Sequence, residues 1–229
     1  MNQPRSFDRV LHWVAAIGPL LFFAVATALG SLQAGYDPIA EPISALALGP
    51  QGWAQAVNFG LLAASFLAFA AVLRKHLSSG VASVAGPSLF VLMAVGVVLA
   101  ALFPMDAEGA PATMSGRLHE IGGFLVFPWM PIALLVVARR YRRDARWRPY
   151  FAYTLATGLF CLAAIVFFLV FVGPPGWPPR LASGLRGLVQ RAMLLPFLTW
   201  ITLVARLACR TAHDEAATRP GERSEALSM

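Results

Sequence analysis

The chain has 229 residues, of which 58% are hydrophobic and 13% are charged, and its formal net charge is +7. Soluble domains are about 45–50% apolar and about 25% charged, so a soluble fold of this length could not bury that much apolar surface. The composition excludes a cytosolic enzyme, a disordered chain and a secreted disulfide scaffold, and it predicts a polytopic membrane protein. The positive charge is typical of a basic membrane protein, so no nucleic-acid partner is expected.

Six apolar runs are each about 20 residues long, which is the length that crosses the hydrocarbon core as a helix. The fold class that follows is all-α, with one six-helix membrane domain over residues 1–210. Residues 211–229 are polar and lack periodicity, so they are predicted to form a disordered tail. The expected spans cover residues 10–30, 53–73, 84–103, 118–138, 150–172 and 188–208.

Basic residues are sorted to one side of this arrangement. The amino-terminal tail, the second and fourth connections and the carboxy-terminal region hold 14 of the 18 Lys and Arg residues. Lys and Arg collect in cytoplasmic segments, so both termini are predicted to be cytoplasmic. An alternative for the first run is a signal peptide, because Arg5 and Arg9 precede its apolar stretch. Cleavage there would leave five helices.

The first outer connection, residues 35–50, is not an ordinary polar loop. Its apolar residues recur at near-helical spacing, which predicts a short interfacial or re-entrant helix. Pro42 suits the first turn of that helix, and Asp37 or Glu41 near its start would suit the helix dipole. The residues that set the spacing are Ile39, Ile43, Leu46 and Leu48.

Both signs of charge and one histidine gather at the outer side. Asp106, His119 and Glu41 are the candidates for an acid, a base or metal ligands in a catalytic site. Zinc held by His and carboxylates would be chemically reasonable, but only one histidine reaches this cluster, so no metal site and no cofactor are expected. The residues predicted to bind a ligand are Arg117, Glu120, Arg191, Ser44 and Asp37.

Arg191 lies about one turn inside the membrane boundary. A buried Arg is expensive in the membrane and normally finds a carboxylate. The expected partner is therefore Asp106, Glu120 or Glu41, in a pair that either holds the helices together or receives a substrate. Ser115 is the predicted N-cap of the fourth span.

Small residues and prolines predict where the helices approach and bend. A strip at four-residue spacing on the second span, Ala56, Gly60, Ala64 and Ala68, predicts close packing of a neighbouring helix. Gly122 and Gly123 predict another close approach on the fourth span. Pro128 and Pro131 predict a kink near the middle of that span. The kink either is structural or opens a cavity, flanked by Trp129 and Trp200.

No two of the four histidines are expected to meet one iron. His12 is placed at the inner end of the first span and His119 at the outer end of the fourth. His76 and His213 fall in segments predicted to be cytoplasmic. A haem held by two histidines is therefore not expected.

Three motifs carry a resemblance to a known family. The order Tyr-Asp-Pro-Ile-x-x-Pro-Ile-Ser-x-Leu-x-Leu-Gly-Pro-x-Gly-Trp begins at Tyr36, and Leu-Phe-Pro-x-Asp and Gly-Arg-Leu-His follow it. Together they resemble the prokaryotic six-helix membrane family catalogued as domain of unknown function 998, over about residues 10–208. The resemblance implies an integral protein of the cytoplasmic (inner) membrane of a prokaryote, and it supplies no established activity.

Three functions are compatible with these features. The favoured one is a non-catalytic membrane subunit or stability factor, in which the outer polar cluster locks the helices together. The second is a lipid or small-molecule handling or transport protein with a bound lipid. The third is a membrane-embedded hydrolase that acts on lipid head groups. The lipid bilayer is the expected environment, and a homo-oligomer or another membrane partner is compatible with all three.

Overall fold

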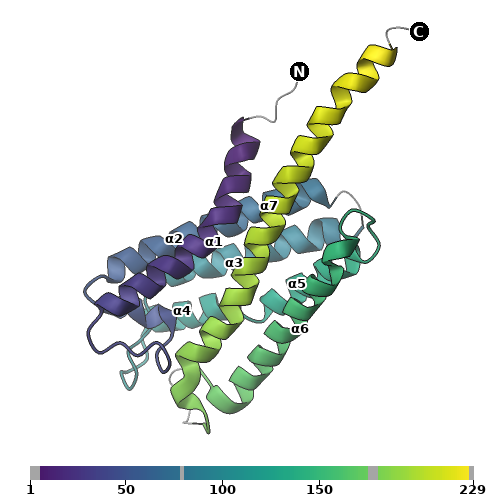
Figure 1. Cartoon of the computed structure of the whole chain (residues 1–229). Helices are drawn as coiled ribbons and strands as arrows, with labels where there is room; N and C mark the ends of the chain where they lie inside the picture. The colour runs from purple at the N-terminus through teal and green to yellow at the C-terminus, as the bar shows by residue number, and fades with distance from the viewer. Residues whose placement is uncertain (1–5, 78–79, 175–179, 227–229) are drawn as a thin grey trace.

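The computed structural model describes residues 6–77, 80–174 and 180–226, and the side chains of those between 8 and 209 (Figure 1). These residues form helices and contain no strand, and six segments are long and apolar enough to cross a membrane. The predicted all-α six-span fold is confirmed. The helical elements are α1 (Ser6–Leu32), η1 (Ile43–Leu48), α2 (Gly52–His76), α3 (Ala82–Leu102), α4 (Met114–Phe124), α5 (Trp129–Tyr141), η2 (Arg148–Tyr150), α6 (Phe151–Phe167), η3 (Phe168–Val172), η4 (Ser183–Leu185) and α7 (Arg186–Ala226).

The start of α1 and the end of α7 lie at the same end of the bundle (Figure 1). We call this end, which also holds the end of α2 and residues 142–150, the inner end, following the predicted orientation. The opposite end holds the connections 33–51 and 103–113 and the start of α7, and we call it the outer end.

The fourth span consists of two helices rather than one. α4 ends at Phe124 and α5 begins at Trp129, with turns between them and Pro128 as the N-cap of α5. Proline lacks the N–H that would continue the helical hydrogen bonds, and its ring clashes with the carbonyl one turn earlier. The predicted interruption is therefore confirmed.

The second span is the centre of the bundle. Within its most apolar window 61% of the residues of α2 are buried, against 28% for the spans that contain α1 and α6. Aromatic rings from α2, α3 and α7 meet in the core: the Phe69 and Phe90 ring centroids are 4.7 Å apart, and those of Phe69 and Trp200 are 5.5 Å apart. Trp200 is fully buried by this packing.

The packing strip predicted on α2 is wrong. Gly60 and Ala64 are exposed, and a Cβ added to Gly60 would meet nothing within 4 Å. The backbones approach closely instead at Gly96 of α3 and Gly122 of α4, where a Cβ on either residue would lie 2.6 Å from the carbonyl oxygen of the other. The close approach predicted at Gly122 is thus confirmed, but Gly123 has only an ordinary contact with the Phe127 ring.

The end of α7 differs from what the sequence predicts for the carboxy-terminal residues. α7 continues as a helix to Ala226, into the stretch from residue 211 for which the sequence predicts a disordered tail. Ala, Glu and Arg favour helix in residues 211–219, whereas Pro220 and Gly221, which lie within the same helix, disfavour it. Residues 227–229 lie outside the described residues.

The short helix expected after the first span is present as η1, with Ile43 and Leu46 buried, while Ile39 and Leu48 are exposed.

Candidate functional site

Arg191, one turn into α7, is the centre of the outer polar cluster. Its Nη1 donates to the carbonyl oxygens of Pro38, Glu41 and Gly187, at 2.8, 3.2 and 3.1 Å. Its Nη2 donates to Tyr36 Oη at 2.6 Å. The carboxylate partner predicted for Arg191 is therefore wrong: backbone carbonyls of the first outer connection, which point toward the guanidinium, take the place of an acidic side chain.

Tyr36 extends this network into the connection. Its hydroxyl donates to the carbonyl oxygens of Glu41 and Pro42, at 3.2 and 3.1 Å. Burial raises the pKa of the Tyr36 phenol above its usual value, against the opposing effect of Arg191. The hydroxyl therefore remains protonated at neutral pH and keeps its role as a donor.

The same connection also docks on the first turn of α7. The N–H of Leu188 donates to the Ile39 carbonyl at 2.9 Å, and Gln190 Oε1 accepts from the N–H of Ile43 at 2.6 Å. The first N–H groups of a helix have no partner within the helix, and the loop supplies one here. Gly187 allows this contact, because a Cβ there would collide with the carbonyl oxygens of Glu41 and Pro38.

Asp106 organises the turn between α3 and α4. Its carboxylate accepts from the N–H of Thr113 at 2.9 Å and from the Thr113 hydroxyl at 2.7 Å. Thr113 in turn caps α4 by accepting from the N–H of Gly116 at 3.1 Å. The N-cap predicted at Ser115 is wrong, since the Ser115 hydroxyl donates to the Pro104 carbonyl instead.

Arg186 joins two further connections at the outer end. Its Nη1 lies 2.8 Å from Glu108 Oε1, and its Nε donates to the Gly173 carbonyl at 3.2 Å. Arg186 is buried, whereas Glu108 is mostly exposed. This ion pair joins α7 to the 103–113 connection, and neither of its residues belongs to the pair predicted for Arg191.

A cavity of about 50 Å³ lies below these contacts. Its polar lining comes from Ser44, His119 and Gln190, and the rest is mostly apolar. The His119 Nδ1 atom is 2.9 Å from the Phe103 carbonyl oxygen, which holds the ring in place. A space of this size admits a few water molecules and is too small for a lipid head group.

The structure separates most of the predicted site residues. Arg117 and Glu120 are exposed, and in the described part of the chain neither side chain makes a hydrogen bond or an ion pair. Asp37 is exposed and accepts from the N–H of Ile39 within its own turn, at 2.8 Å. Of the predicted residues only Ser44 and His119 share the cavity. Among the described residues no group of three or more His, Cys, Asp and Glu side chains can hold a metal ion.

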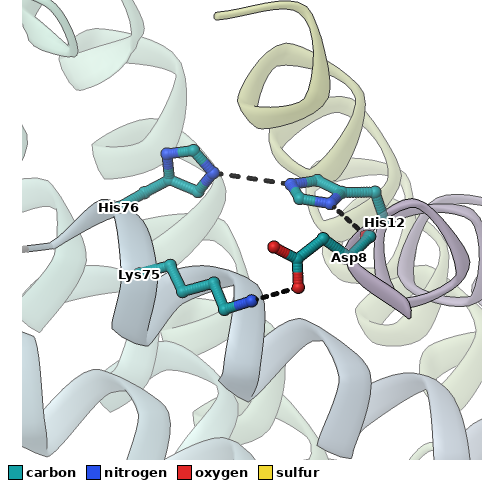
Figure 2. Close-up of polar contacts among 4 residues, drawn as sticks. All are labelled: Asp8, His12, Lys75 and His76. Carbon is teal, nitrogen blue, oxygen red and sulfur yellow. Dashed lines mark hydrogen bonds and ion pairs between the residues drawn. The ribbon is translucent and has the colours of Figure 1, made fainter. Parts of the chain in front are cut away.

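A second polar cluster lies at the inner end and was missed by the sequence analysis. Figure 2 shows His12 of α1 facing His76 of α2, with their Nε2 atoms 3.5 Å apart. Asp8 accepts from both helices: its carbonyl oxygen lies 2.7 Å from His12 Nδ1, and its Oδ1 lies 2.5 Å from Lys75 Nζ. The sequence analysis places His12 and His76 in different segments and does not predict this contact. Consecutive spans form an antiparallel hairpin, so the start of α1 and the end of α2 had to lie together.

Comparison with known proteins identifies the family of the chain. Residues 16–207 match the family described as "Protein of unknown function (DUF998)". The chain belongs to this family. No curated protein and no solved structure matches it. The DUF998 match spans the outer cluster and His76, whereas His12 precedes it.

The Asp106 turn of this DUF998 protein gives a pH-dependent prediction. The Thr113 hydroxyl, and then its backbone N–H, hold the pKa of Asp106 below its ordinary value of 3.8. A carboxyl group whose pKa is lowered by folding stabilises the fold above its unfolded-state pKa, and that contribution is lost as the pH falls through the folded-state pKa. We expect Asp106→Asn to lower the midpoint of thermal unfolding near neutral pH, and the difference from wild type to shrink below about pH 4.

Glu120→Gln is the matched control for this experiment, because Glu120 is an exposed carboxylate at the same end of the bundle. Its unfolding midpoint should follow that of the wild type throughout the titration. A difference between Asp106→Asn and wild type that is the same at every pH would contradict the assignment to the ionised carboxylate.

Proposed function

We propose that this protein is a non-catalytic membrane subunit or stability factor whose outer polar cluster fastens its helices together. The observation that carries the proposal is the set of hydrogen bonds that the Arg191 guanidinium donates within the protein. Four acceptors from the chain itself, three carbonyls and the Tyr36 hydroxyl, occupy it. An Arg committed in this way contributes to the packing of α7 against the first connection rather than to the capture of a substrate.

The contacts of Arg186 and Asp106 at the outer end support the same conclusion. Arg186 is paired with Glu108, and the carboxylate of Asp106 is engaged by Thr113. The cavity next to His119, of about 50 Å³, has room for a few water molecules. A hydrolase would need an acid, a base and a substrate in contact, whereas Asp106 and His119 each bond to separate parts of the α3–α4 connection.

Arg191→Ala tests the proposal directly. Hydrogen bonds to charged groups contribute about 1.5–3 kcal/mol each, and a buried acceptor left without a donor adds a desolvation cost. We expect Arg191→Ala to lower accumulation in the membrane several-fold and to lower the midpoint of thermal unfolding in mild detergent. Arg191→Lys should give an accumulation and an unfolding midpoint between those of Arg191→Ala and the wild type. The Lys ammonium is a compact point charge, and it cannot reach all four acceptors as the planar guanidinium of Arg191 does.

Arg117→Ala is the matched control, since Arg117 is an arginine at the same end of the bundle with an exposed side chain. It should accumulate and unfold like the wild type. If Arg191→Ala also behaves like the wild type, the outer cluster is not a structural lock and the proposal fails. Native mass spectrometry after mild extraction is the second test: a co-purifying partner chain supports the proposed membrane subunit, and a stoichiometric lipid supports lipid handling instead.

A further inference from the structure

The small cavity at the outer end lies where the fourth span is interrupted. Gly122 and Gly123 of α4 and Gly96 of α3 line this space of about 50 Å³ and contribute no side chain to fill it. Phe127 also lines it, and in a continuous helix the carbonyl of Phe127 would accept from the N–H of residue 131, but Pro131 has no N–H. Within a membrane span, ordered water is one of the groups that satisfy the backbone atoms which proline leaves free.

Gln190 of α7 places an amide donor at this cavity. Its side chain is 9% exposed, and its Oε1 accepts from the N–H of Ile43 at 2.6 Å. Since an N–H can only donate, this contact fixes which end of the Gln190 amide is the oxygen. The Nε2 atom has no acceptor among the residues that the structure describes. A buried donor without an acceptor costs free energy, so we expect the contents of the cavity that Gln190 lines to supply one.

His119 and Ser44 add an acceptor and a hydroxyl to the same lining. The Nδ1 atom of His119 lies 2.9 Å from the Phe103 carbonyl oxygen, which can only accept, so Nδ1 carries a hydrogen. The neutral ring therefore has a lone pair on Nε2, and no donor in the described part of the chain reaches it. The Ser44 hydroxyl of η1, which can donate or accept, has no partner among the described residues either.

These three groups match what a buried water molecule requires. Such a molecule needs two to four polar partners, makes about three hydrogen bonds, and occupies a cavity of at least about 10–15 Å³. Gln190 offers a donor, His119 an acceptor and Ser44 a hydroxyl, and water can both accept and donate. An apolar guest would leave all three groups without a partner, which is why cavities that stay empty are lined by apolar side chains.

We propose that the cavity is a binding site for ordered water, which accepts from Gln190, donates to His119 and bonds to the Ser44 hydroxyl. The water thereby joins α7, α4 and η1. Among the described residues no hydrogen bond or ion pair joins α4 directly to α7 or η1, and α4 packs against α3. The bound water thus fastens a helix that Arg191 does not reach. The site depends on the lining of the cavity and not on the Arg191 contacts, so either proposal can fail without the other.

NMR of the full-length protein with ¹⁵N-labelled glutamine, in mild detergent micelles, tests the water site. The side-chain N–H signals of Gln190 should show a cross-peak to water whose NOE and ROE have opposite signs, which identifies bound water rather than hydrogen exchange. Ser44→Val should abolish this cross-peak, because its methyl groups fill the space and remove the hydroxyl. Ser31→Ala is the matched control and should keep the cross-peak, since Ser31 is exposed near the outer end of α1 and its hydroxyl donates to the Ala28 carbonyl.

Amide hydrogen exchange tests the bridge to α4. Ser44→Ala removes one partner of the water without filling the cavity, so exchange in α4 should become about two- to ten-fold faster, the factor that one hydrogen bond contributes. Ser31→Ala should exchange like the wild type.

The wild-type measurements need no variant to fold, and they can overturn the proposal by themselves. A Gln190 side chain without a cross-peak to bound water contradicts it. So does xenon binding, seen as shifts of the methyl signals of Leu62 and Leu194, because these residues line the cavity and xenon enters cavities that are dry. A cross-peak that persists in Ser44→Val, or wild-type exchange of α4 in Ser44→Ala, would overturn it as well.

Discussion

Trp200→Ala is expected to destabilise the protein by about 3–5 kcal/mol, the usual cost of truncating a buried tryptophan. The Trp200 ring lies 5.5 Å from the Phe69 ring and is stacked on the Phe90 ring at 6.3 Å between centroids. Its Nε1 donates to Thr154 Oγ1 at 2.9 Å, which joins α7 to α6. Removal of the indole leaves a cavity where three spans meet and takes a hydrogen bond from a fourth.

The free energy of unfolding in mixed detergent and SDS micelles measures this cost. Trp53→Ala is the matched control, since Trp53 is 73% exposed at the start of α2. Substitutions at exposed positions usually change stability by no more than about 0.5 kcal/mol. Equal losses for the two variants would contradict the assignment of Trp200 to the core and revive the interpretation that it lines a ligand cavity.

The number and boundaries of the spans follow from composition and hydropathy. The bilayer demands about 20 apolar residues per helix, and five of the six predicted runs fall within a helical segment that is long and apolar enough to span. The third run, residues 84–103, passes the end of its segment at Leu102 by one residue. The break at Pro128 was equally predictable, because a missing N–H is a property of the residue and not of its surroundings. These predictions need no knowledge of which helices touch.

The face that each helix turns inward was harder to predict. The small residues on α2 predict its packing face, but Gly60 is exposed and has no neighbour where a Cβ would lie. Gln55 and Asn58 give the better signal, because polar side chains within a span almost always face the interior, and both are buried. Asn58 Nδ2 donates to the Phe22 carbonyl of α1 at 3.0 Å.

The candidate sites depended on contacts that the sequence does not encode locally. Arg191 was expected to need a carboxylate, yet the backbone of residues 36–43 satisfies it, and no residue type reports where a carbonyl will point. His12 and His76 lie in different segments of the sequence, 64 residues apart, and neither segment alone indicates the other as its neighbour. The antiparallel hairpin that α1 and α2 must form brings them together, so the topology was the missing step.

The crossing of α3 and α4 gives the second large expected effect. A Cβ at Gly96 or Gly122 would lie 2.6 Å from the carbonyl oxygen of the other residue, and backbone atoms cannot move aside as a flexible side chain can. Overpacking of a tight contact costs about 1–3 kcal/mol. We therefore expect Gly96→Ala and Gly122→Ala each to lower the free energy of unfolding, although alanine favours helix over glycine by about 1 kcal/mol.

The control and the double variant make this prediction specific. Gly60→Ala places the same methyl group on an exposed helical face, so it should leave stability unchanged or raise it. Gly96→Ala and Gly122→Ala enter one contact from its two sides. Once the first methyl group has forced α3 and α4 apart, the second meets less resistance, and the double variant should lose less than the sum of the single losses. Additive losses would show that the two glycines are not in contact, and the crossing would then have to be placed elsewhere on these helices.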